Sequence, residues 1–215
     1  MSITQQIRTA IAPLHNQIEK TAYSHAIMSG GLSVDDYVVS IAQLLRIHEA
    51  VETHAANEPV AGFFDPAMAR TEALQRDLGF WGADLGELTT LPETDRTVAW
   101  IHSLHRTEPI GLLGLVYVLE GSRMGSLVIA KPLAAALGTL PVEGKGLDYH
   151  TEGARETPMR LKSWKAKIDQ NPFSQLEIES IIQSSVTFMD LLNQVYDALP
   201  VSEPRRAQSL RADVA

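Results

Sequence analysis

The feature that most constrains the fold is a long apolar segment, residues 109–138, in which a proline and a glycine mark the two ends of one predicted helix. About 30 residues at 1.5 Å each would make this helix roughly 45 Å long. Inside it lies YVLEGSRMGS (117–126), where Gly121 and Gly125 stand four residues apart. Each interior glycine costs a helix about 1 kcal/mol relative to alanine. This stretch therefore needs a bare backbone, either for close packing of another helix or for contact with a flat ligand.

Helical periodicity recurs through the rest of the chain, and the alternation of apolar and polar residues that marks β-strands hardly appears. Near the start, apolar residues fall on one helical face from Ile7 to Ile18. Capping-box pairs mark the start of two longer helices: Ser33 with Asp36, and Ser174 with Glu177. Shorter helices are predicted at 66–78, at 95–106 and from Pro158 onward, with irregular stretches at 79–94 and 139–157.

These segments predict an all-α fold, with a single domain of about seven or eight helices over residues 1–200. The chain has 215 residues, of which 45% are hydrophobic, so it is long enough for one compact domain with a sizeable core. Residues 201–215 are polar and are expected to form a disordered tail.

Composition excludes several classes of function. The net charge of -8 and the pI of 5.3 give no support to nucleic acid or an anionic membrane as a partner. The absence of cysteine rules out disulfides, iron–sulfur clusters, cysteine-based zinc sites and a thiol nucleophile. The N-terminus lacks the apolar core of a signal peptide, and the most apolar stretch, 110–119, is too short to span a bilayer. A cytoplasmic location without membrane attachment is expected.

Seven histidines are the remaining candidates for metal ligation. None of them follows a glutamate at the Glu-x-x-His spacing of ferritin-type di-iron bundles. His102 with His105, and His48 with Glu52, lie one helical turn apart. Amphipathic helices also produce such pairs without any metal, so a surface or core-edge role is favoured for each.

His15 differs because it stands at the border of the apolar face of the first helix, with Glu19 one turn later. A carboxylate at this spacing can accept the second N–H of the imidazole, which leaves the other nitrogen free to bind a metal. From this pair alone, a boundary histidine beside a surface glutamate is the simpler interpretation.

Two stretches together resemble the haem oxygenase family, in its bacterial, biliverdin-producing branch. LHNQIEKTAYSHAIMSGGLSVDDY (14–37) is similar to the proximal segment of the family, in which a histidine ligates the haem iron and a glutamate one turn later supports it. YVLEGSRMGS is similar to the distal helix, whose paired glycines lie kinked over the haem face. Two later stretches follow the family in the same order, YHTEGARETPMRLKSW (149–164) and SSVTFMDLL (184–192).

The resemblance implies an all-α fold that holds haem between the first, proximal helix and a long kinked distal helix. It implies an enzyme that opens the haem ring at a meso carbon to give biliverdin, free iron and carbon monoxide. Haem would be both cofactor and substrate, and dioxygen and external electrons would be consumed. The electron donor would be a ferredoxin or a flavoprotein reductase, and a bilin-using photoreceptor is a candidate user of the product.

The resemblance also implies roles for individual residues. His15 would ligate iron, supported by Glu19. Gly121, Ser122 and Gly125 would form the catalytic distal surface. The other side chains expected to contact haem are Arg8, Tyr117, Arg123, Lys131, Lys165 and Phe188.

Two positions depart from the pattern of the family. Ser126 stands where many members have a further glycine, and Ser122 stands where the mammalian-type branch has an aspartate. A haem-binding or haem-storage protein of the same fold is therefore one alternative. A non-haem di-metal oxidase-like protein is another, and the local cluster that could serve it is His48, Glu49, Glu52 and His54.

Overall fold

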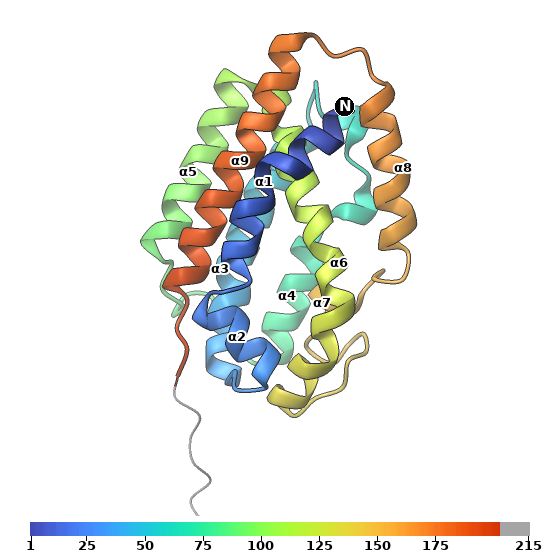
Figure 1. Cartoon of the computed structure of the whole chain (residues 1–215). Helices are drawn as coiled ribbons and strands as arrows, with labels where there is room; N and C mark the ends of the chain where they lie inside the picture. Colours follow the sequence, from blue (N-terminus) through green and yellow to red (C-terminus); the bar gives the residue numbers. More distant parts are fainter. Residues whose placement is uncertain (203–215) are drawn as a thin grey trace, which may run out of the picture.

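The computed structural model describes residues 1–202, with the backbone alone at Leu127. Residues 203–215 of the predicted tail lie outside the described part. Within it the chain forms nine α-helices: α1 (Ile3–Ile18), α2 (Ala22–Ser29), α3 (Val34–Ala55), α4 (Thr71–Phe80), α5 (Pro92–Thr107), α6 (Leu112–Leu137), α7 (Asp148–Thr151), α8 (Thr157–Gln170) and α9 (Gln175–Ala198). Short 3₁₀ turns occur at Ala61–Phe63, Pro66–Met68 and Pro109–Gly111. The predicted single all-α domain is confirmed (Figure 1).

Most helix ends follow the local signals in the sequence. Ser174 and Glu177 form a complete capping box, in which each side chain accepts a hydrogen bond from the backbone N–H of the other. Gly138 ends α6 in the left-handed conformation, with φ of 68°. Helix α2 was not predicted, because a helix of 8 residues is too short to show periodicity. Its signals are the cap at Thr21 and the left-handed Gly30.

Helix α6 and the 3₁₀ turn just before it carry two pairs of glycines that face different surroundings. A Cβ atom on Gly111 would collide with the Ser184 side chain, and one on Gly114 with the backbone oxygen of Ile181. This pair therefore lets α9 pack directly against the backbone of α6. By contrast, apart from neighbouring residues and nearby backbone of α6 itself, no described atom lies within 4 Å of the place where a Cβ on Gly121 or Gly125 would stand. The second pair is not explained by helix packing.

Helix α6 is also sharply bent. The angle between its two halves is 65°. The first half, counted together with the 3₁₀ turn that precedes α6, is Pro109–Ser126, and the second half is Val128–Leu137. Pro132 accounts for the place of the bend, because a proline removes one helical hydrogen bond and its ring clashes with the carbonyl four residues earlier, that of Val128. The Gly125–Ser126 pair just before the bend makes the backbone easier to deform.

Helix α9 holds the two helices that matter most for the site. Both α1 and α6 pack extensively on α9, whereas in the described part of the chain they make little contact with each other. The isoleucines of α1 at positions 3, 7 and 11 are buried in the core beneath it. The result is a gap between α1 and α6 on one face of the molecule (Figure 1).

Within the described residues, no single helix is both long and apolar enough to cross a membrane. The two halves of α6 meet those criteria only when they are taken together across their bend. The cytoplasmic location expected from the sequence stays a prediction.

The two glycine pairs should respond differently to alanine. Gly121→Ala adds a methyl group in open space, so the free energy of unfolding should stay the same or rise by about 0.5–1 kcal/mol. Gly114→Ala must displace the backbone of α9 and should lower it by about 1–3 kcal/mol. Urea unfolding followed by circular dichroism measures both values. Equal destabilisation by the two substitutions would contradict the assignment of the pairs.

Candidate functional site

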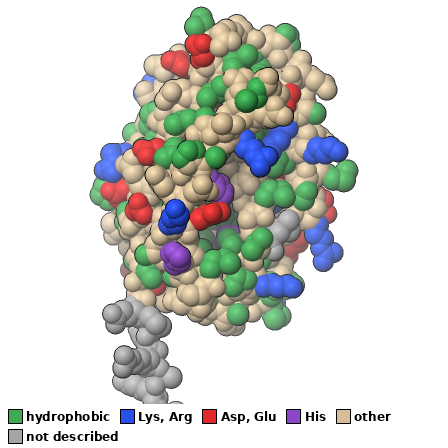
Figure 2. Space-filling view, in the orientation of Figure 1, with side chains coloured by type: hydrophobic (Ala, Val, Ile, Leu, Met, Phe, Trp, Pro, Cys, Tyr) green, Lys and Arg blue, Asp and Glu red, His purple; other side chains and the backbone are tan. Residues whose placement is uncertain are grey.

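The candidate site is the cleft between α1 and α6. The space-filling view shows this face hollowed between the two helices, with histidine side chains in and beside the hollow (Figure 2). The bare stretch of α6 at Gly121 and Gly125 faces open space. The apolar side chains next to it, Met124 and Val128, are exposed. An apolar surface with no side chain at its centre suits a flat, apolar ligand.

His15 and Glu19 lie at the C-terminal end of α1, the helix on one side of the cleft. The imidazole Nδ1 lies 3.5 Å from Glu19 Oε1, and the side chain of His15 is 52% exposed. When Nδ1–H donates to the carboxylate, the neutral imidazole presents Nε2 as a lone pair for a metal. The helix beneath is held in place by Asn193 of α9, whose side chain donates a hydrogen bond to the backbone oxygen of Leu14.

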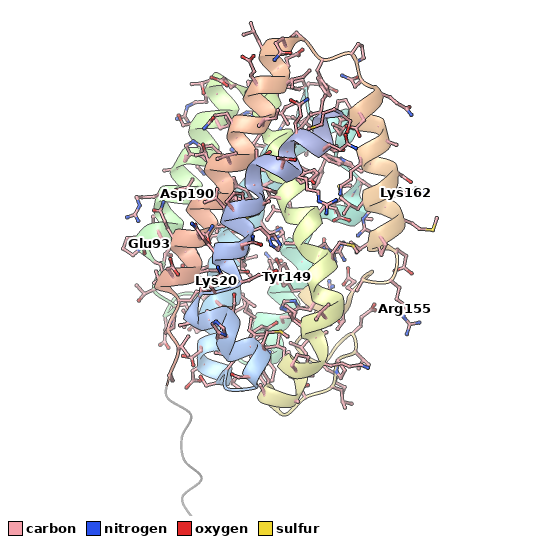
Figure 3. The ribbon with its side chains drawn as sticks, viewed as in Figure 1. Lys20, Glu93, Tyr149, Arg155, Lys162 and Asp190 are labelled. Atoms are coloured by element: carbon pink, nitrogen blue, oxygen red, sulfur yellow. The ribbon has the colours of Figure 1, made fainter. Side chains whose placement is uncertain are left out.

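Ser122 lies on α6, the helix on the other side of the cleft, and Tyr149 lies on α7. The Ser122 hydroxyl donates to the backbone oxygen of Leu119 at 2.7 Å. Tyr149 extends from α7 into the space between α1 and α6 (Figure 3). It is buried, and burial raises the pKa of its hydroxyl. Tyr149 therefore stays neutral and can donate or accept a hydrogen bond.

Behind Tyr149, a histidine and a glutamate continue the polar contacts. His48 Nε2 lies 3.4 Å from the Tyr149 hydroxyl, and His48 Nδ1 lies 3.0 Å from Glu52 Oε1. Glu52 also accepts from the backbone N–H groups of Arg70 and Thr71, and so caps the start of α4. Burial alone would raise the pKa of Glu52, but the hydrogen bond from His48 and the backbone donors lower it. Glu52 is thus a fixed carboxylate that orients His48.

The short helix α7, which carries Tyr149, is anchored by Asp77. This carboxylate accepts from the backbone N–H groups of Asp148 at 2.7 Å and Tyr149 at 2.8 Å. Asp77 is fully buried, and burial raises its pKa to about 7 despite these hydrogen bonds. The next residue of α7, His150, is buried against Ser126 of α6, and burial lowers its pKa to about 4.

Three of the predicted contact residues lie together beside the cleft. Lys165 Nζ of α8 lies 5.1 Å from the centre of the Tyr117 ring, a cation–π contact. Arg8 of α1 is close enough to act on both, since its charge lowers the pKa of Lys165 in addition to the larger effect of burial. Two cations beside a phenol are a combination that can attract a carboxylate. Lys131 does not join them: it is exposed on the second half of α6.

Arg123 and Phe188 are placed differently. Arg123 is buried, pairs with Glu120 and donates to the backbone oxygen of Glu152. Phe188 is fully buried in the core and stacks on Trp100, with ring centres 6.4 Å apart. These contacts are structural, and a direct contact of either side chain with haem stays a prediction.

The residues of the alternative di-metal site are used otherwise. His48 and Glu52 bind each other, whereas Glu49 is exposed next to Gln75. His54 contacts His102 at 2.7 Å and stacks on His105. Among the described residues, no group of three or more histidine, aspartate or glutamate side chains is arranged to hold a metal ion.

A cavity of about 510 Å³ lies elsewhere, between α8 and the turns at 61–68. It is lined by aromatic side chains, but it offers neither imidazole nor carboxylate–imidazole pair as an iron ligand. Its cations are already engaged: Arg160 with Glu120, and Lys167 with the backbone oxygen of Gly62. The open cleft is therefore the better candidate.

Comparison with known proteins agrees with this geometry. The family model described as heme oxygenase matches residues 1–197. The chain belongs to the haem oxygenase family. It is 24% identical to heme oxygenase 1 of Homo sapiens over 226 aligned residues, which cover 97% of this chain and 78% of that protein.

Solved structures show the same fold. Heme oxygenase from Leptospira interrogans has a TM-score of 0.83 at 24% identity, covering 92% of this chain and 99% of that one. Heme oxygenase-1 from Synechocystis, solved in complex with heme, has a TM-score of 0.81 at 17% identity, covering 92% and 91%. At these identities the likeness establishes the haem oxygenase fold and leaves the branch of the family open.

Sequence reasoning missed several residues around the cleft. His48 and Glu52 were identified as a pair one turn apart and as part of a candidate di-metal cluster, whereas Asp77 and His150 were not singled out. Their importance comes from partners far away in the chain, such as Tyr149 for His48. One signal was available in the sequence. Asp77 falls on the apolar face of its predicted helix, together with Ala73 and Leu78, and an ionisable side chain at such a buried position often has a specific role.

The two buried groups around α7 make opposite predictions for stability against pH. Asp77 binds its proton more tightly in the folded protein (pKa about 7, against 3.8 as the ordinary value), so its stabilising contribution is lost as pH rises through about 7. His150 has a folded pKa of about 4 against 6.5, so its contribution is lost as pH falls from about 6.5 toward 4. Between about pH 4 and pH 6.5 the two groups change the free energy of unfolding in opposite directions, each by about 1.4 kcal/mol per pH unit.

Replacing one of the two groups should therefore remove its pH dependence and reveal that of the other. Asp77→Asn should make the free energy of unfolding rise with pH between about 4.5 and 6.5, and His150→Gln should make it fall over the same range. Urea unfolding of both variants and of the unsubstituted protein at three pH values measures the difference. The same pH dependence in all three proteins would contradict these protonation states.

Proposed function

We propose that this chain is a haem-degrading monooxygenase of the bacterial, biliverdin-producing branch, which converts haem to biliverdin, free iron and carbon monoxide. The observation that supports the proposal is that α1, which carries His15 beside Glu19, and α6, which carries the bare backbone at Gly121 and Gly125, lie on opposite sides of one cleft (Figure 2). Membership of the haem oxygenase family and a related structure solved with heme support it.

The residues fit haem as substrate on the proximal side. His15 would bind the iron through Nε2, while Glu19 accepts the Nδ1 proton and fixes the orientation of the ring. Its half-exposed position at the edge of the cleft leaves room for a planar ligand. Arg8, Lys165 and the Tyr117 hydroxyl would hold the propionates at one end of the cleft.

On the distal side the protein positions the substrate and controls protons. The bare backbone at Gly121 and Gly125 allows α6 to approach the ring face closely, and this approach selects which edge of the ring is oxidised. Haem and dioxygen supply the oxidising power. Ser122 carries a hydroxyl on this side that donates to the backbone oxygen of Leu119, and the His48 imidazole lies behind Tyr149. When it turns from Leu119 to the ligand, this hydroxyl would supply a hydrogen bond without being a strong acid or base.

The reaction consumes electrons that the protein does not hold, so a ferredoxin or a flavoprotein reductase is the proposed donor. The product biliverdin would then serve a bilin-using photoreceptor, or the released iron would be the benefit to the cell.

The iron ligand is tested by His15→Ala, with His25→Ala as the matched control because His25 is an exposed histidine on the neighbouring helix α2. Titration with haemin should give the Soret band of a histidine-ligated haem in the unsubstituted protein and in His25→Ala. His15→Ala should lose this band and weaken haem binding at least about tenfold, the effect of about 1.4 kcal/mol.

Turnover is tested by adding ascorbate in air to the complex. Decay of the Soret band into the broad red absorption of biliverdin is expected for the unsubstituted protein and not for His15→Ala. A Soret band that persists in the unsubstituted protein would identify a haem-binding or storage protein instead. Failure to bind haemin at all would overturn the proposal.

A further inference from the structure

Pro132 explains where α6 bends, but it does not explain in which direction the second half of the helix tilts. Pro132 and the Gly125–Ser126 pair weaken the helix near residue 127, yet a weakened helix can tilt in several directions. The far end of the second half is buried in the core through Leu133, Ala134 and Leu137, whereas Val128 next to the bend is exposed. A specific contact at the bend itself adds to this packing and can select one geometry.

Ser126 makes such a contact. It is the last residue before the bend, and its hydroxyl lies 3.3 Å from Nδ1 of His150. Both side chains are buried, with Ser126 5% and His150 8% exposed, so no water competes freely for the bond. A serine here supplies a hydroxyl where a glycine would supply none.

The partner of Ser126 is itself held rigidly. His150 belongs to α7, whose first backbone N–H groups are bound by the buried carboxylate of Asp77. Arg76 adds a bond from its Nε to Asp148 at 2.9 Å. The contact therefore ties the bend of α6 to α4, which belongs to the frame of the fold.

We propose that the hydrogen bond between Ser126 and His150 fixes the tilt of α6 and so determines which meso carbon of haem is oxidised. The inference rests on the proposed function, and it assigns Ser126 and His150 as positioning residues that do not touch the substrate. Gly125 immediately precedes Ser126, so a change of tilt moves the glycine surface over the ring. The meso positions compete within one bound substrate, and a small shift of that surface changes the ratio of biliverdin isomers.

The first test measures the tilt without haem. The chain has no cysteine, so spin labels can be attached at two introduced ones, Ala135→Cys on the second half of α6 and Lys162→Cys on α8, both exposed. Double electron–electron resonance should give a single narrow distance distribution. Adding Ser126→Ala should broaden or shift it, and adding Ser126→Thr, which keeps the hydroxyl, should restore it.

The matched control is Ser185→Ala, a buried helical serine whose hydroxyl, among the described residues, bonds within its own helix. It should leave the distance distribution unchanged. An unchanged distribution in Ser126→Ala, or an equal change in the control, would overturn the inference.

The second test uses the haem-loaded protein with a reductant in air, and separates biliverdin isomers by chromatography. Ser126→Ala should raise the share of minor isomers at least about threefold while haem binding through His15 is retained, and Ser126→Thr and Ser185→Ala should match the unsubstituted protein. If the unsubstituted protein forms no biliverdin, the proposed function fails and the spin-label distances alone decide on the contact. If it forms biliverdin and Ser126→Ala gives the same isomer ratio, the inference fails while the function stands.

Discussion

The structure depends on the absence of side chains along one helix. At Gly111 and Gly114, atoms of α9 occupy the space that side chains would otherwise take. The same helix α9 also supports α1. At Gly121 and Gly125 no other helix fills that space, although each interior glycine weakens the helix. Along this segment the first glycine pair allows close packing against α9, and the second pair leaves an open backbone surface. The position of His15 relative to that surface follows from the shared support on α9.

The second constraint is the set of buried polar groups behind the cleft. Asp77, Glu52 and His150 each bind a partner on a different helix, and together they tie α3, α4, α6 and α7. Buried ionisable groups lower stability unless they are satisfied, so a sequence selected for stability alone would replace them with apolar side chains. Their position around Tyr149 and the bend of α6 indicates that they hold the distal side of the site in one geometry.

Local signals predicted much of the fold and part of the site. Three features each depend on residues within one helical turn, so the spacing of residues was sufficient to predict them. They are the capping box at Ser174, the end of α6 at Gly138 and the contact of His15 with Glu19. The contacts of Tyr149 with His48 and of Asp77 with α7 join residues 101 and 71–72 positions apart, and only the fold brings these together. The bend at residue 127 has a local cause in Pro132, but its direction depends on contacts with other helices.

The most direct test of this account is a crystal structure of the complex with haemin. We expect iron bound by Nε2 of His15, with the opposite face of the ring against the backbone of Gly121 and Gly125 and no side chain between them. The propionates should reach Arg8 and Lys165. Haem bound in the cavity between α8 and the turns at 61–68, or iron ligated by another side chain, would contradict it.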